Sequence, residues 1–127
     1  MATEFTILIQ DRPGALADLT EALAKGGVNI IAIHATPCPD QAVVQLVTNN
    51  NEATVEALKV ADIEYTAREV LLLSIAHEPG ALARLSRAIA NVGVNIDALY
   101  LTNSGQIVLQ ADNLRAAQKA ALELGVM

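Results

Sequence analysis

Two glycines, Gly14 and Gly80, stand where the sequence predicts the first turn of a helix. Each follows a proline, which suits a helix start, and leucines then recur at helical spacing. The leading amides of a helix lack intrahelical partners, and the positive end of the helix macrodipole lies beside them. Because glycine has no side chain, a ligand can approach this backbone closely. We therefore expect each helix start to bind a carboxylate or a similar anion.

The residues around these glycines form one block that occurs twice. Asp11–Ile30 returns as His77–Ile96 without insertion or deletion, with 12 of 20 positions identical. A repeat at fixed spacing predicts two copies of one fold, related by a pseudo-twofold axis. We assign residues 1–67 to the first repeat and residues 68–127 to the second.

Side-chain oxygens that can accept hydrogen bonds from an ammonium group accompany both helix starts. Asp11 stands two residues before the first proline, and Asn29 and Asn95 follow the two helices. In the second repeat His77 replaces Asp11, and it can accept only when its imidazole is neutral. We therefore expect two sites of unequal chemistry.

The first repeat is predicted to fold as βαββαβ. Apolar runs rich in β-formers, bounded by Pro, Gly, Asn and Asp, alternate with helical periodicity. The expected strands are 5–10, 28–36, 42–48 and 63–66, with helices over 13–25 and 52–61.

The second repeat is predicted as βαββα, without a last strand, because Ile63 falls opposite Val126. The expected elements are strands 69–76, 94–102 and 106–111, a helix over 79–91, and a helix that Asp112 caps and that runs to Leu124. Two right-handed split βαβ crossovers give an antiparallel sheet with both helices on one face. The predicted fold class is α+β, with two ferredoxin-like repeats.

Composition excludes several classes of function. A net charge of −6 repels nucleic-acid backbones, and one Phe with two Tyr and no Trp gives no platform for stacking bases. The apolar runs are too short to span a bilayer, and the single Cys38 gives no internal disulfide. We expect a cytoplasmic protein that binds neither nucleic acid nor membrane. Each repeat, at about 60 residues, is near the lower size limit for independent folding.

A βαββαβ unit with Pro-Gly-x-Leu at its first helix and Gly-Val-Asn-Ile entering its second strand resembles an ACT domain. Two such units in tandem cover nearly the whole chain. The resemblance implies a regulatory module that binds a free amino acid between paired domains and is associated with an enzyme of amino-acid metabolism, and we expect it to need no cofactor. By position in the motif, it implies ligand contacts from Asp11, His77, Asn29 and Asn95. ACT domains that bind ligands often carry Asn near the Pro, and neither repeat has it there.

We expect two sites, each assembled from both repeats. One joins the turn before the first helix to the strand entry of the second repeat, through Asp11, Arg12, Pro13, Gly14, Ala15, Leu16, Asn95 and Ile96. The other joins His77, Glu78, Pro79, Gly80, Ala81 and Leu82 to Asn29 and Ile30. The small Ala15 and Ala81 favour a small amino acid. In the alternative interpretation the Pro-Gly pairs only start helices and the Asn side chains only hold turns. The protein would then be a regulatory or structural subunit that docks on a biosynthetic enzyme without a ligand of its own.

Metal binding and catalysis are not predicted. His34, Cys38 and Asp40 lie close in sequence, but no second Cys or His cluster accompanies them, and a hairpin turn explains them better. No nucleophile and base have a suitable spacing. An enzyme of the same fold would need such a group of titratable residues.

Three charges near the first helix of each repeat reverse sign between the copies. The reversed pairs are Arg12 and Glu78, Asp18 and Arg84, and Glu21 and Arg87. Drift on solvated faces is one interpretation, because surface charges contribute little to stability. In the other, the two helices lie side by side within the chain and pair unlike charges.

The predicted loss of the last strand has a consequence for assembly. It would leave the strand at 69–76, with its apolar Val70–Leu73, as an open sheet edge. We therefore expect this strand to pair with the same strand of a second chain, which would make the protein a homodimer.

Overall fold

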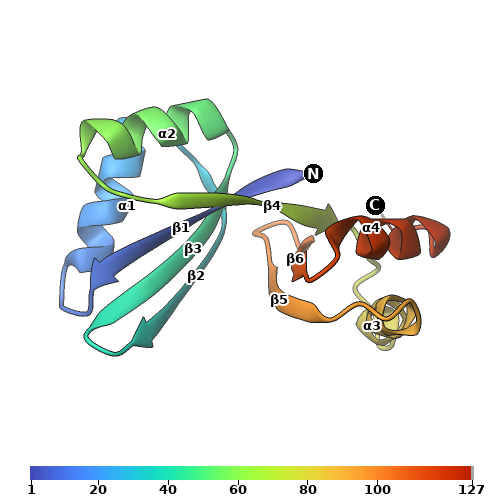
Figure 1. Cartoon of the computed structure of the whole chain (residues 1–127). Coiled ribbons are helices and arrows are strands. Elements are labelled where there is room, and N and C mark those ends of the chain that lie inside the picture. The colour runs from blue at the N-terminus through green and yellow to red at the C-terminus, as the bar shows by residue number, and fades with distance from the viewer. Residues whose placement is uncertain (127) are drawn as a thin grey trace. The chain divides into compact units, whose positions relative to one another are not determined.

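The computed structural model describes residues 1–126 and divides into two compact units (Figure 1). Residues 3–68 form one unit, called the first repeat below. The residues from 69 onward form the other, called the second repeat, and Met1 and Ala2 group with it. The structural division thus falls next to the boundary assigned on the sequence. Each repeat is described by itself.

The first repeat carries three strands and two helices and the beginning of a fourth strand, β4. Its elements are β1 (Ala2–Gln10), α1 (Ala15–Lys25), β2 (Ile30–Cys38), β3 (Gln41–Thr48), α2 (Asn51–Val60) and the start of β4 (Thr66–Leu73). Strand β3 lies between β1 and β2 and pairs antiparallel with both; Val44 faces Ile7 of β1, and Leu46 faces Ile33 of β2.

The core of the first repeat is built from apolar residues that recur every second position on strands and every turn on helices. Phe5 and Ile7 alternate along β1, and Leu19 and Leu23 stand one turn apart on α1; all four are buried. With Leu58 of α2 and residues of β3 they form one cluster. Both helices therefore cover the same face of the sheet, as predicted.

The second repeat contains the rest of β4 followed by α3 (Ala81–Asn91), β5 (Ile96–Leu101), β6 (Ile107–Ala111) and α4 (Leu114–Glu123). Strand β6 pairs antiparallel with β4 and with β5. Leu85 and Ile89 of α3 and Ala121 of α4 pack on Leu71 and Leu109 of the sheet. No strand follows α4 within residues 1–126, so the predicted βαββα order holds there. The α+β ferredoxin-like fold class is confirmed.

Strand β4 corrects the prediction of two separate strands at 63–66 and 69–76. The structure has a single strand, Thr66–Leu73. Asp62 adopts a left-handed conformation with φ 56°, and the amide of Ile63 donates to Leu58 O at 2.9 Å. The residues directly after α2 therefore form the turn that ends the helix and not a strand. The part of β4 that belongs to the second repeat pairs with β6 through Leu71–Leu73, and the homodimer stays a prediction.

The helix starts differ slightly from the prediction. Helix α1 begins at Ala15 and α3 at Ala81, so the prolines lie before the helices and the glycines are the N-caps. Asn50 caps α2 by accepting from Ala53 N at 3.0 Å. For α4 the predicted cap, Asp112, is wrong: Asn113 takes that place and accepts from Ala116 N at 3.1 Å.

Replacing Gly80 with alanine is expected to lower the free energy of unfolding by about 1 kcal/mol, because Gly80 holds φ 89°, where a Cβ is strained. Urea denaturation followed by circular dichroism measures the change. Pro79→Ala, next to it but outside the left-handed region, serves as the control. Equal stability of Gly80→Ala and the wild type would contradict the expectation.

Candidate functional site

The turn between β1 and α1 places the first candidate residues at the start of a helix. The amide of Arg12 donates to Gln10 O at 3.0 Å, and that of Ala15 donates to Arg12 O at 3.3 Å. Gly14, at φ 88°, turns the chain into the helix without a side-chain cap. Within the described chain the amides of Leu16 and Ala17 donate to no other group. These amides are therefore available to an anion.

A guanidinium lies over this helix start. Arg12 donates from Nε to Gln10 Oε1 at 2.8 Å, from Nη1 to Pro13 O at 3.1 Å, and from Nη2 to Asp18 Oδ2 at 3.2 Å. Its Nη1 is 3.6 Å from the position that a Cβ on Gly14 would occupy. Three contacts thus hold the guanidinium beside the free amides, where it adds to the attraction for a carboxylate.

The second repeat reaches the same arrangement with the charges exchanged. Arg84 Nη2 donates to Glu78 Oε1 at 3.0 Å, and Arg84 Nη1 is 3.2 Å from the Cβ position of Gly80. Arg84 is equivalent to Asp18, and Glu78 to Arg12. Two of the three sign reversals therefore preserve one ion pair within each repeat, and both repeats hold a guanidinium over the N-cap glycine. Sequence analysis missed this pairing, although the two coupled reversals were its signal.

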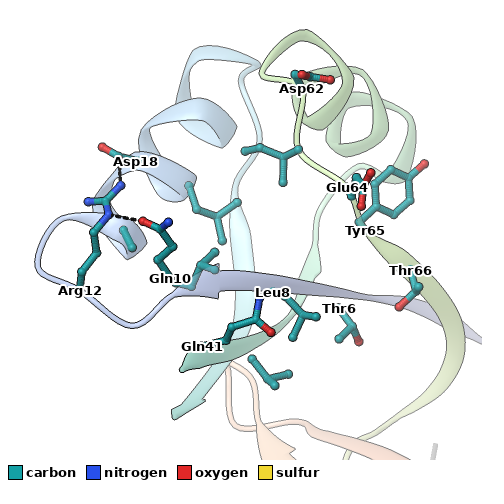
Figure 2. Close-up of a pocket in the computed structure, with 15 residues that line it drawn as sticks. Thr6, Leu8, Gln10, Arg12, Asp18, Gln41, Asp62, Glu64, Tyr65 and Thr66 are labelled. Atoms are coloured by element: carbon teal, nitrogen blue, oxygen red, sulfur yellow. Dashed lines mark hydrogen bonds and ion pairs between the residues drawn. The ribbon is translucent and has the colours of Figure 1, made fainter. Parts of the chain in front are cut away.

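A pocket of about 700 Å³ opens beside this turn in the first repeat (Figure 2). Of the predicted site residues, Arg12 and Ala15 line it, whereas Asp11, Pro13, Gly14 and Leu16 do not. Its walls come from β1, β3, the start of α1 and the segment between α2 and β4. Those residues are Thr6, Leu8, Ile9, Gln10, Asp18, Leu19, Gln41, Val43, Asp62, Ile63, Glu64, Tyr65 and Thr66.

Charged side chains lie on two sides of the pocket, and on one of them Arg12 is paired with the acidic Asp18. Figure 2 shows Arg12 and Asp18 on one side, and Asp62 and Glu64 on the other. A guanidinium can bind a carboxylate, and carboxylates can bind an ammonium group. The side from Asp62 to Thr66 was not predicted, because the β-formers Ile63 and Tyr65 favoured a strand there. The sequence held no other signal for it.

The two repeats align differently at their second helices. The N-caps Asn50 and Asn113 are closer together in sequence than the N-caps Gly14 and Gly80 of the first helices. After the second helices, the amide of Ile63 donates to Leu58 O, and that of Val126 donates to Ala121 O, both at 2.9 Å. Gly125, at φ 82°, is consequently the equivalent of Asp62, at φ 56°. The second repeat thus has no carboxylate at the position of Asp62.

Asn29 and Asn95 lie beyond the far ends of α1 and α3, and side chains that follow β3 and β6 accept from their main-chain amides. Asn29 N donates to Asn49 Oδ1 at 3.0 Å, and Asn95 N donates to Asp112 Oδ1 at 3.0 Å. The side chain of Asn95 also donates to Asp97 Oδ1 at 3.1 Å. Since α1 has 11 residues and is about 16 Å long, Asn29 cannot share a ligand with the turn of its own repeat. A site that joins each turn to the other repeat stays a prediction.

The remaining predicted residues fall into two groups. Exposed residues are Asp11, Pro13, His77, Glu78, Pro79, Leu16 and Leu82. Ala15 and Ala81 are buried at the helix starts, and Ile30 and Ile96 are half-buried against the two cores. The predicted site residues therefore surround the helix starts and helix ends without forming one cluster within a repeat.

The residues considered for a metal lie in the β2–β3 hairpin. Asp40 occupies the turn with φ 64°, Cys38 pairs with Gln41 in the strands, and Thr36 Oγ1 lies 3.3 Å from His34 Nδ1. Among residues 1–126 no three His, Cys, Asp or Glu side chains could together hold a metal ion. In the same part of the chain no helix is long and apolar enough to cross a membrane.

Two ferredoxin-like units in tandem, each with Pro-Gly before its first helix, define the class of protein. The sequence profile of the ACT domain pair family matches residues 1–125, and the chain belongs to this family.

Solved structures share the fold at low sequence identity. Protein BT0572 from Bacteroides thetaiotaomicron matches with a TM-score of 0.90 and 24% identity over 98% of this chain and 89% of the other. The regulatory subunit of aspartate kinase from Thermus thermophilus, in its ligand-free form, matches with a TM-score of 0.71 and 23% identity, over 95% and 90%. No curated protein sequence matches the chain.

Proposed function

We propose that the chain is a non-catalytic regulatory protein that binds a small amino acid in the pocket of its first repeat. The observation that carries this proposal is the placement of Arg12 on one side of the pocket and of Asp62 and Glu64 on the other. The Arg12 guanidinium takes the ligand carboxylate. The two acidic side chains take its ammonium group.

The lining of the pocket agrees with a ligand of this kind. The apolar Ile9, Leu19, Ile63 and Val43 line it together with the charged residues. They can contact a side chain of the ligand while the polar groups fix its orientation. The second repeat has Gly125 in place of Asp62, so the first repeat is the stronger candidate. The second turn, His77–Leu82, would bind more weakly.

A regulatory role fits the family to which the chain belongs. The regulatory subunit of aspartate kinase from Thermus thermophilus has the same fold. By that likeness we propose an enzyme of amino-acid metabolism as the partner. The amino acid would change the affinity for this partner by binding one state of the chain more tightly than another.

Isothermal titration of the purified chain with each of the twenty amino acids tests the proposal. We expect one or a few small amino acids to bind, and Arg12→Ala and Asp62→Asn each to weaken that binding at least tenfold. Asparagine tolerates the left-handed conformation of Asp62, so this variant removes the charge without strain.

Arg84→Ala is the matched control, because it removes the equivalent guanidinium of the second repeat and should leave the affinity unchanged. Absence of both heat and a thermal shift with all twenty amino acids would overturn the proposal. The interpretation as a subunit that docks on an enzyme without a ligand would then stand.

A further inference from the structure

The structural alignment of the repeats shows that the charge reversal extends over the whole helical layer. When α1 is matched to α3 from their caps Gly14 and Gly80, and α2 to α4 from Asn50 and Asn113, every acidic position of α1 and α2 has a basic equivalent. The exposed or half-exposed pairs are Asp18 and Arg84, Glu21 and Arg87, Glu52 and Arg115, and Glu56 and Lys119. The chain has only eight Lys and Arg, and four of them lie here. Random drift does not predict such concentration in a chain of net charge −6.

Most of these charges are not used within the chain. Asp18 and Arg84 pair inside their own repeats. The other six residues of these pairs take part in none of the ion pairs among residues 1–126. They are Glu21, Glu52, Glu56, Arg87, Arg115 and Lys119. Six charges, three of each sign, therefore remain for another partner.

The same layers also differ in the size of their apolar residues. A groove of about 710 Å³ runs between α1 and α2, and its lining includes Gly26 and Ala61. Val92 and Leu124 occupy the equivalent positions in the second repeat and are 51% and 40% exposed in the single chain. Leu124 lines the corresponding groove beside α3. The α1–α2 layer thus carries the acidic members of these pairs beside small residues. The α3–α4 layer carries the basic members beside larger apolar side chains, and its groove has a similar volume of about 780 Å³.

We propose that the α1–α2 layer of one chain docks on the α3–α4 layer of a second copy. The two layers share one fold, so in a pseudo-twofold contact the positions near the axis face their own equivalents, as Glu21 would face Arg87. The acidic members of the pairs on one layer then face the basic members on the other. Like layers would instead place acid on acid or base on base, which disfavours them. The charge and size differences between the repeats therefore select contacts between unlike repeats of two chains.

Two charge-reversed chains test this docking by equilibrium sedimentation at low salt. The first carries Glu21→Arg and Glu56→Arg, and the second carries Arg87→Glu and Lys119→Glu. We expect the wild-type chain to associate, and each variant alone to associate at least tenfold more weakly. An equimolar mixture should recover the association, because each basic layer again meets an acidic one in the other chain.

The control reverses an exposed charge outside the helical layers, Glu69→Arg, and should associate like the wild type. Circular dichroism checks that each variant is folded. If the wild type is a monomer at micromolar concentration, the proposal fails. It also fails if the mixture behaves as its separate components do, since pairing within one chain, or docking on a different protein, gives that result.

Discussion

Arg68→Ala is expected to lower the free energy of unfolding by about 2–3 kcal/mol, because it leaves the Glu4 carboxylate buried without its guanidinium. The Glu4 side chain is fully buried, and Arg68 Nε donates to its Oε1 at 2.7 Å. Gln45 Nε2 lies 3.5 Å from the same oxygen and cannot replace a cation. The Arg68 side chain is 41% exposed, so water reaches the pair and the effect stays below that of a fully buried ion pair.

Urea denaturation measures the change, and the double variant Glu4→Leu with Arg68→Ala provides the comparison. Removing both groups leaves no buried carboxylate that has lost its guanidinium, so the double variant should be more stable than Arg68→Ala alone. A double variant that is less stable by the sum of the two single changes would count against a dominant role for this ion pair.

The Glu4–Arg68 pair also shows what local sequence patterns cannot supply. The two residues are 64 positions apart and meet because β1 and the start of β4 lie together in the first repeat. The repeated block, in contrast, contains its own structural signals. Pro-Gly before a helix and Gly-Val-Asn-Ile before a strand act within a few residues, so the fold could be predicted from them.

The pocket could be predicted only in part, for the same physical reason. Arg12 and Ala15 belong to the repeated turn, and sequence spacing identified them. Asp62 and Glu64 come from the segment after α2. There the hydrogen bond from the Ile63 amide to Leu58 O outweighs the preference of these residues for a strand. The secondary-structure propensities of single residues do not predict that hydrogen bond.

The change of alignment between the first and second helices arises in the hairpins of the two repeats. Strands β2 and β3 have nine and eight residues, whereas β5 and β6 have six and five. A comparison that keeps the spacing of the repeated block throughout therefore misaligns the second helices. The caps Asn50 and Asn113 fix the alignment there and bring Glu52 and Glu56 opposite Arg115 and Lys119.

Gly26→Ala is expected to lower the free energy of unfolding by about 2 kcal/mol through crowding between α1 and α2. A Cβ at Gly26 would lie 2.7 Å from the Cβ of Ala57, closer than real side chains approach. The backbone of Gly26 has φ −81°, which alanine adopts without strain. The effect should therefore be steric, unlike that of Gly80→Ala.

A double-mutant cycle with Ala57→Gly tests this cause. If the two Cβ atoms collide, Gly26→Ala should cost less in the Ala57→Gly background, with a coupling of about 1 kcal/mol. Additive changes would contradict the steric account. In the second repeat Val92 and Ala120 occupy these positions, so the end of α3 accommodates a Cβ that the end of α1 does not. Gly26 therefore permits the close approach of α1 to α2 beside the groove that we propose as a docking surface.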